Sequence, residues 1–245
     1  EMRLTIGFFL IVLGITPLLW NCATTIPPTG GPKDSLPPIL QNSRPNNNAT
    51  SYSQQEVTLA FDELVILKNA KEEISITPSP GKDVDFYAKK NQIIVRFKKP
   101  LESNSTYSIS FRQSIQDITE GNPAEDLRLA FSTGPTIDSL RLYGTVSVYP
   151  SVTPGTKFTV AIYQADTFNI YKHSPVYFTK TDKSGRFTLY NLKPGRYVIY
   201  CFDDKNKNLK CDSQSERFGI YTDSIRLPEH KDSIRLTAVK LDSRP

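Results

Sequence analysis

Residues 92–111 read QIIVRFKKPLESNSTYSISF, and apolar side chains alternate with polar ones near both ends of this stretch. The alternating apolar positions are Ile93, Val95, Phe97, Tyr107, Ile109 and Phe111. A period of two is typical of a strand with one buried face. Between the two runs, Ser103–Ser105 supplies small polar residues that favour a turn. The stretch therefore predicts two strands and sets an all-β fold class.

The same alternation continues on both sides of this stretch. It recurs in four further segments, Val57–Phe61, Ile74–Ile76, Val84–Phe86 and Leu127–Phe131. Residues that favour turns, mainly Pro, Gly, Asn and Ser, separate the segments. Short alternating strands at this spacing within residues 38–133 predict one β-sandwich domain.

Residues 139–242 carry a second set of alternating segments. They are Leu140–Val148, Phe158–Ile162, Val176–Phe178, Phe187–Leu189 and Val198–Phe202. The sequence Asp-Ser-Ile-Arg-Leu then occurs twice, at residues 223–227 and 232–236, and we expect both copies to form closing strands. These patterns predict a second β-sandwich directly after the first.

The first residues of the chain have the layout of an export signal. Arg3 precedes an apolar run, Ile6–Leu13, and the apolar stretch that continues beyond it is interrupted by Pro17. A transmembrane helix needs about 20 apolar residues, so this layout fits a signal peptide over residues 1–21 better. Cys22 stands at the cleavage point, where the bacterial lipoprotein pattern places the cysteine that receives acyl chains. The alternative is an ordinary secretory signal with an incidental cysteine.

Residues 22–37 follow as a polar segment rich in Pro and Gly. Because both residue types oppose regular structure, we expect an extended tether that begins at the lipidated Cys22. The predicted organisation is thus a lipoprotein signal peptide and a Pro/Gly-rich tether, followed by two consecutive β-sandwich domains.

The formal net charge of +5 is spread along the chain, with pairs such as Lys89-Lys90 and Lys98-Lys99 and no longer basic run. A nucleic-acid-binding protein more often shows a clustered basic stripe, so we expect no nucleic-acid partner. A mild positive excess suits a surface that faces anionic lipid headgroups, and it suits ordinary solubility equally well.

Four motifs in and beside the first predicted sandwich carry a resemblance. They are Pro37–Pro45, Val57–Glu63, Leu101–Tyr107 and Phe131–Thr133. In this order they resemble the bacterial Ig-like domain of S-layer and other cell-surface proteins. Together with Thr29–Asp34, just after Cys22, they make the chain similar to the Ig-like-domain lipoproteins of Bacteroidota. The resemblance implies an outer-membrane lipoprotein, anchored through palmitate or similar acyl chains on Cys22, at the cell surface or on the periplasmic face.

The second predicted sandwich carries a resemblance of its own. Its motifs are Gly144–Val146, Thr181–Phe187 and Leu192–Tyr197. They are similar to the carboxypeptidase-regulatory or prealbumin-like domain. This resemblance implies the role of a stalk, spacer or docking platform and not of a catalyst.

Residues 203–216 contain the best candidate for a metal site. Its predicted oxygen ligands are Asp204, Asn206, Asn208, the carbonyl of Lys210, Asp212 and Glu216. Alternate residues of a tight loop can wrap Ca²⁺, which takes about six to eight hard oxygen ligands. The loop resembles the calcium-binding loops of Gram-positive surface B-repeats, which implies a structural Ca²⁺ and no other cofactor. The alternative is an Asx-rich turn, in which Asn and Asp satisfy their own backbone, and Leu209 in place of the usual glycine favours it.

Two cysteines follow Cys22 in the chain, Cys201 and Cys211. An oxidising compartment would permit a disulfide between them. Cys201 lies in a strand-like run and Cys211 in a polar loop, so a bridge and two separate thiols both remain open.

Asp-Ser followed by an aliphatic residue occurs four times, and its serines are Ser35, Ser139, Ser224 and Ser233. The pattern is similar to the O-glycosylation sequon that Bacteroidota use on exported proteins. Ser35 and Ser139 fall in predicted linkers and fit this role better than Ser224 and Ser233, which we expect in strands.

No pattern in the chain predicts an enzyme. Nucleophile-elbow, zinc-protease, P-loop and dinucleotide motifs are absent from the sequence, and His173 and His230 stand in polar, loop-like surroundings. We expect a non-catalytic accessory subunit whose partner is an outer-membrane β-barrel complex for assembly, export or uptake, or another envelope protein. The alternative is a surface carbohydrate-binding or adhesive module with an exposed aromatic platform. The tyrosines available for such a platform are Tyr163, Tyr171, Tyr177 and Tyr200.

Overall fold

The computed structural model describes residues 33–124, 126–149, 156–166, 169–211, 216–230 and 233–240. The predicted signal peptide, Cys22, most of the predicted tether and Asp212 lie outside these ranges. Residues Ser35–Pro245 form one compact unit, which holds every strand named below. Across the described ranges, no helix is both long enough and apolar enough to cross a membrane.

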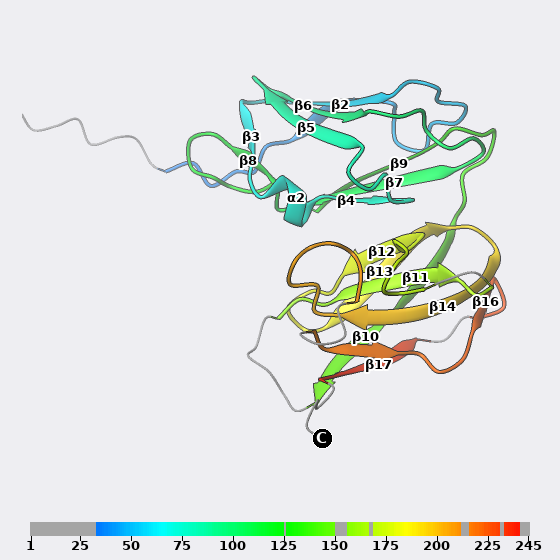
Figure 1. The fold of residues 1–245 in the computed structure, drawn as a ribbon. Helices are drawn as coiled ribbons and strands as arrows, with labels where there is room; N and C mark the ends of the chain where they lie inside the picture. The colour runs from blue at the N-terminus through cyan, green and yellow to red at the C-terminus, as the bar shows by residue number, and fades with distance from the viewer. Residues whose placement is uncertain are drawn as a thin grey trace, which may run out of the picture. The chain divides into compact units, whose positions relative to one another are not determined.

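The first part of this unit is a β-sandwich with one helical turn (Figure 1). Its elements are β1 (Leu40–Arg44), β2 (Glu56–Phe61), β3 (Val65–Leu67), α2 (Ala70–Glu73), β4 (Ser75–Thr77), β5 (Val84–Lys89), β6 (Gln92–Phe97), β7 (Thr106–Arg112), β8 (Ile115–Asp117) and β9 (Leu127–Ser132). One sheet has the order β1-β2-β6-β5, the other has the order β4-β7-β9, and β3 pairs with β8. The predicted all-β sandwich is confirmed.

The alternating apolar positions of the two facing sheets meet in one core. Leu59 and Val95 come from one sheet, Ile109 comes from the other, and all three are fully buried. Tyr107 stacks on Phe131 with the ring centroids 5.6 Å apart. Because burying a large apolar side chain stabilises a fold by about 1.5–3 kcal/mol, this core accounts for the pairing of the sheets.

The second part is an eight-stranded sheet that closes around its own core. Its strands are β10 (Leu140–Tyr149), β11 (Thr159–Gln164), β12 (Tyr177–Lys180), β13 (Arg186–Leu192), β14 (Gly195–Phe202), β15 (Phe218–Ile220), β16 (Ile225–Leu227) and β17 (Ile234–Val239). The order is β12-β11-β14-β15-β17-β10-β13, and β16 pairs with β14 off this path. The step from β15 to β17 rests on the pair Phe218 and Val239. The two halves on either side of that step enclose one apolar cluster, which makes this part a sandwich as well.

The parallel pair β10 and β17 depends on Gly144. A Cβ at this position would lie 2.0 Å from the carbonyl oxygen of Ile234 and 2.8 Å from the ring of Phe187. No side chain fits at such a distance, so glycine allows the two backbones to approach. Gly144 therefore permits the pairing that closes the second sheet.

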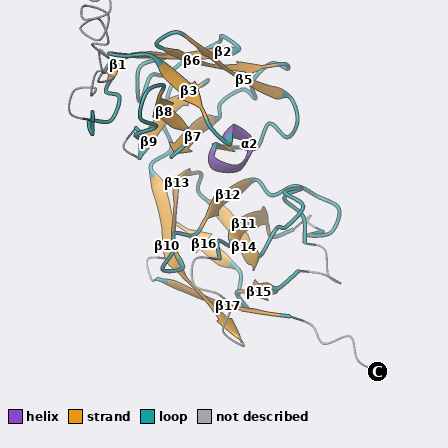
Figure 2. Ribbon diagram, turned by 90° about the vertical axis from the view of Figure 1, so that its left-hand side faces the viewer, coloured by secondary structure: helices purple, strands orange, loops and turns teal. Residues whose placement is uncertain are grey.

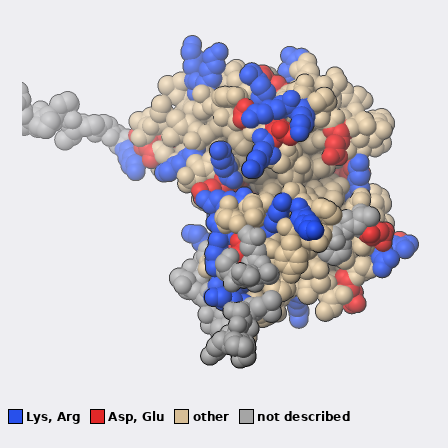
Figure 3. Space-filling view, in the orientation of Figure 1, with Lys and Arg blue, Asp and Glu red and all other residues tan. Residues whose placement is uncertain are grey.

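The edge strands β12 and β13 face the first sandwich (Figure 2). β12 contacts β4 and β13 contacts β7, but no hydrogen-bonded ladder joins the two sandwiches among the described strands. Polar side chains make the connection: Lys193 Nζ donates to the Asn104 carbonyl at 2.6 Å, and Lys157 Nζ lies 3.3 Å from Glu73 Oε1. Lys and Arg side chains gather along this line of contact between the two sandwiches, which we call the seam (Figure 3). The covered edges are thereby protected from pairing with other chains.

Candidate functional site

The loop after β14 holds the predicted metal ligands. It leaves the sheet at Phe202 and returns against the outer face of β11 and β14. There Cys211 packs in a second apolar cluster with Tyr163 and Ile170, and its N–H donates to the Ile170 carbonyl at 3.2 Å. The loop is therefore fixed to the sheet through Cys211, while residues 205–208 are exposed.

Asp and Asn side chains of this loop accept hydrogen bonds from nearby backbone N–H groups. The carboxylate of Asp204 accepts from Asn208 at 3.0 Å and from Leu209 at 3.3 Å. Asn206 Oδ1 also accepts from the Asn208 N–H, at 3.1 Å, and Asn208 Oδ1 accepts from the Lys210 N–H at 2.8 Å. These contacts are those of successive Asx turns.

Two buried carboxylates hold the base of the loop. Asp203 accepts from the Arg217 N–H at 2.7 Å, and its other oxygen lies 3.4 Å from Arg217 Nη1. Glu216 accepts from the Lys205 N–H at 2.8 Å. Glu216, the predicted last ligand of the calcium ion, therefore joins the two ends of the loop.

Burial is the main influence on the charge of Asp204 and raises its pKa. The Leu209 and Asn208 N–H groups and the charge of Lys180 lower that pKa, and the charge of Glu216 raises it. A bound cation would favour the ionised carboxylate. Among the described residues, no three His, Cys, Asp or Glu side chains are grouped to hold a metal ion. Because Asp212 lies outside those residues, calcium binding stays a prediction beside the Asx turn.

Cys201 and Cys211 are buried in different clusters. Cys201 faces the main core of the second sandwich, whereas Cys211 packs under the loop on the other face of the sheet. Successive residues of a strand point to opposite faces, and β14 turns Cys201 away from the loop. No disulfide joins the two, so the structure has the separate thiols. Burial raises the pKa of Cys201 to about 12.

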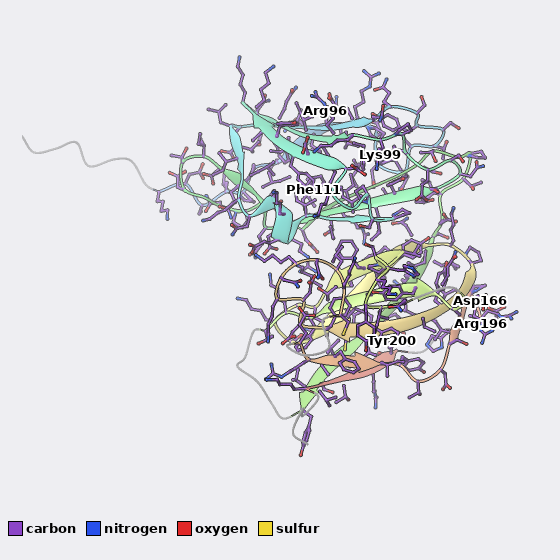
Figure 4. All side chains as sticks on the ribbon, viewed as in Figure 1. Arg96, Lys99, Phe111, Asp166, Arg196 and Tyr200 are labelled. Carbon is purple, nitrogen blue, oxygen red and sulfur yellow. The ribbon has the colours of Figure 1, made fainter. Side chains whose placement is uncertain are left out.

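The four serines of the predicted O-glycosylation sites are all exposed. Ser35 precedes β1, and Ser139 lies between β9 and β10. Ser224 and Ser233 come directly before β16 and β17, outside both strands. Arg196, labelled in Figure 4, donates from Nε to Ser224 Oγ at 2.9 Å. Solvent exposure therefore does not distinguish the four serines from one another, and their O-glycosylation stays a prediction.

The tyrosines considered for an aromatic platform do not form one. Tyr163 and Tyr177 are only 1% and 3% exposed. Tyr200, labelled in Figure 4, meets Tyr163 edge to face at an interplanar angle of 86°. Tyr171 is exposed but stands on a loop. The four rings therefore offer no shared flat surface for a sugar.

An exposed apolar cluster, which we call the apolar tip, lies at the end of the first sandwich that carries β3 and β8. Its members and their exposed fractions are Leu36 (69%), Ile39 (58%), Leu64 (52%) and Ile118 (58%). Sequence reasoning missed this cluster, because its members stand in four separate segments and follow no strand period.

Backbone contacts bring the segments of the apolar tip together. The Ile118 N–H donates to the Leu64 carbonyl at 3.2 Å, and the Asp62 N–H donates to the Ile39 carbonyl at 3.1 Å. Figure 1 shows the described chain entering the sandwich at this same end. The tip is thus a fixed surface formed where the chain enters.

Asp117 organises the loop that presents Ile118. Its Oδ1 accepts from the N–H groups of Thr119 (2.9 Å), Glu120 (2.6 Å) and Gly121 (3.0 Å). Its Oδ2 accepts from Asn122 at 2.7 Å. Burial raises the pKa of Asp117, but these four donors outweigh it and hold the pKa below its ordinary value.

Comparisons with known proteins identify the first sandwich. The family model of the bacterial Ig-like domain matches residues 34–133, which confirms the predicted Ig-like domain. No curated protein matches the chain.

Solved structures show only distant likeness. An L,D-transpeptidase from Mycobacterium smegmatis is 12% identical, over 67% of this chain and 76% of that chain, with a TM-score of 0.29. The N-terminal part of the bacterial S-layer protein SbsC is 10% identical, over 83% of this chain and 44% of that chain, with a TM-score of 0.26. A streptococcal ancillary pilin is 17% identical, over 64% of this chain and 50% of that chain, with a TM-score of 0.24.

Proposed function

We propose that this chain is a non-catalytic, lipid-anchored outer-membrane protein that serves as an accessory subunit of an outer-membrane β-barrel complex. The apolar tip is the observation that carries the proposal. Single exposed apolar side chains are common on soluble proteins, whereas grouped ones mark contact surfaces. The tip is the surface that meets the partner.

The position of the tip fits an anchored protein. Leu36 belongs to the predicted tether, whose other end is Cys22. Acyl chains on Cys22 would keep the tip close to the membrane, where the rim and loops of a β-barrel protein lie. Removing Leu64 and Ile118 from water there would contribute about 1.5–3 kcal/mol each.

The Ig-like match supports the coarser part of this proposal, a surface or adhesive module. The rival role, carbohydrate binding by an aromatic platform, loses its main support because Tyr163 and Tyr177 are buried. The accessory role is therefore the better account of the exposed groups.

The test is purification of the full-length protein from its native membrane in mild detergent, with mass spectrometry of what accompanies it. The variant is the double substitution Leu64→Asp and Ile118→Asp, and the control is Ile220→Asp, which alters an apolar side chain of the second sandwich that is 45% exposed. We expect a stoichiometric β-barrel partner with the wild type and the control, and its loss with the double variant. Recovery of the wild-type protein alone would contradict the proposal.

A further inference from the structure

A cleft of about 1040 Å³ lies between the outer face of β4-β7-β9 and the edge strands β12 and β13. The first sandwich lines it with Ser75, Thr77, Ser108, Ser110, Arg112 and Arg128. The second sandwich adds Lys180, Arg186 and Thr188 among others. Its size is at the upper end of the range for small-molecule sites, about 300–1,000 Å³.

The hydroxyl groups of this cleft have unused hydrogen-bonding capacity. Ser75, Thr77 and Ser108 are at most 9% exposed, yet their side chains, like that of Ser110, form no hydrogen bond to any described residue. These hydroxyl oxygens are not among the buried polar atoms that lack a partner in the described residues, so the cleft leaves them accessible to the polar groups of a ligand. One sheet face thus presents four hydroxyls to the cleft.

Two half-buried cations lie beside these hydroxyls. Arg112 Nη2 donates to the Lys180 carbonyl at 2.5 Å, and Lys180 Nζ donates to the Glu72 carbonyl at 2.8 Å. Among the described residues, no carboxylate forms an ion pair with either cation. Burial is the largest influence on both groups and lowers the pKa of each; the charge of Arg112 lowers the pKa of Lys180 further, while more distant carboxylates oppose the shift without forming an ion pair. An anion would offset that cost.

The backbone directs Arg112 to this place. The register of β7 against β9 shifts between Ser110 and Arg112, and Arg112 adopts a φ of 46°. A bulge of this kind re-aims a side chain, and a non-glycine residue at positive φ is uncommon outside functional or tightly constrained positions. Arg112 therefore enters the cleft because the strand is locally distorted.

The other charges of the cleft leave an excess of cations. Arg186 Nε lies 3.5 Å from Asp182 Oδ2, which neutralises that pair. Arg128 stacks over the ring of Tyr190 at 3.5 Å from its centroid. Asp126 is the other carboxylate in the lining, and its charge acts on Arg112.

We propose that this cleft binds an acidic saccharide, with its carboxylate on Arg112 and Lys180 and its hydroxyls on the serine and threonine side chains of β4 and β7. A guanidinium matches the planar geometry of a carboxylate. A row of neutral hydroxyls fits a polyhydroxylated ligand better than it fits an acidic peptide, whose apolar groups would find little surface here. This site is separate from the apolar tip and does not depend on the accessory role.

The test is isothermal titration calorimetry of the full chain with a hexamer of galacturonic acid. The comparison ligands are a neutral glucose hexamer, hexaglutamate and inorganic phosphate. We expect the galacturonate hexamer to bind and each of the other three to bind at least about tenfold more weakly, because only it supplies both recognition elements.

Variants connect that binding to the cleft. Arg112→Gln should weaken it at least about tenfold, because it removes the charge that holds the carboxylate, and Arg112→Lys should retain part of the binding, because it keeps that charge. Arg128→Gln should weaken it less, and it tests the site even if Arg112→Gln does not fold. Arg235→Gln, an equal charge change on the exposed face of β17, is the matched control. Absent binding, equal binding of any comparison ligand, or variants that bind as the wild type would overturn the proposal.

Discussion

The apolar tip and the cleft between the two sandwiches differ in the kind of side chain that each one presents. The tip exposes Leu64 and Ile118 to water, while Asp117 satisfies the backbone N–H groups of the loop that follows Ile118. The cleft does the reverse, because it holds Arg112 and Lys180 in a polar lining where, among the described residues, neither forms an ion pair with a carboxylate. Apolar groups gain from a dry partner, and buried polar groups gain from a polar one. On the two proposals above, one chain would offer two surfaces for two chemically different partners.

The largest predicted effect tests whether these two surfaces are independent. The Leu64→Asp, Ile118→Asp double variant should lose its co-purifying partner almost completely and bind the galacturonate hexamer as the wild type does. Arg112→Gln should show the opposite pattern. Mass spectrometry of the purified complex and calorimetry on the same samples measure both. If either variant removed both activities, the two surfaces would be one site.

A smaller effect is predicted for Asp117→Asn, which concerns the tip alone. An amide keeps one acceptor and turns an NH₂ toward a backbone donor, so the midpoint of thermal unfolding should fall by several degrees at neutral pH. Because the folded pKa of Asp117 is depressed, its stabilisation is present above the unfolded pKa of about 3.9 and is lost as the pH falls through the folded pKa. Scans from about pH 7 down to about pH 2 should therefore show the two proteins converging. A constant difference across that range would contradict the role of the charge.

Asp204→Asn should have a smaller effect, of opposite sign. The pKa of Asp204 is raised in the folded protein, so its protonated form stabilises the fold. That contribution is lost as the pH rises through the folded pKa, and at neutral pH the ionised carboxylate lowers the free energy of unfolding. In EDTA at pH 7, removing the charge should raise the unfolding midpoint slightly, and a fall would contradict this account.

Calcium gives the same substitution a second use. If the loop binds Ca²⁺, adding the ion should raise the midpoint of the wild type and leave that of Asp204→Asn unchanged. If it is an Asx turn only, neither midpoint should move. Thermal scans with Ca²⁺ and with Mg²⁺ as the matched control decide between them.

The smallest predicted effect is that of a reductant. Cys201 and Cys211 are buried in different clusters, so dithiothreitol should leave the unfolding midpoint unchanged. Burial keeps the Cys201 thiol protonated, with a pKa of about 12, and iodoacetamide should label it only after unfolding. Rapid labelling of Cys201 in the native protein, read by peptide mass spectrometry, would argue against this packing.

Strand alternation predicted most of this fold because it reports one buried face directly. Residues 92–111 became β6 and β7, and the two Asp-Ser-Ile-Arg-Leu copies led into β16 and β17. The segment Val176–Phe178 was less accurate, since β12 spans Tyr177–Lys180 and both Tyr177 and Phe178 are buried. Tyr177 belongs to the core of its own sandwich, whereas Phe178 lines the cleft beside the first sandwich. A sequence pattern cannot show that another sandwich will cover Phe178.

Both interaction surfaces escaped sequence reasoning for the same physical reason. Ser108, Ser110 and Arg112 fill the alternate positions of β7, which by themselves indicate an ordinary solvated face. Only the packing of β12 and β13 against that face turns it into a cleft. The tip likewise depends on tertiary contacts between segments far apart in the chain, such as the hydrogen bond from Asn122 Nδ2 to the Leu36 carbonyl.

Site-specific photo-crosslinking in cells that make the full-length protein tests the central claim most directly. A benzophenone side chain replaces Ile118 in one strain and Ile220, the exposed control on β15, in another. The account predicts a single crosslinked product with an outer-membrane β-barrel protein from position 118 and none from position 220. Equal crosslinking from both positions, or none from position 118, would contradict it.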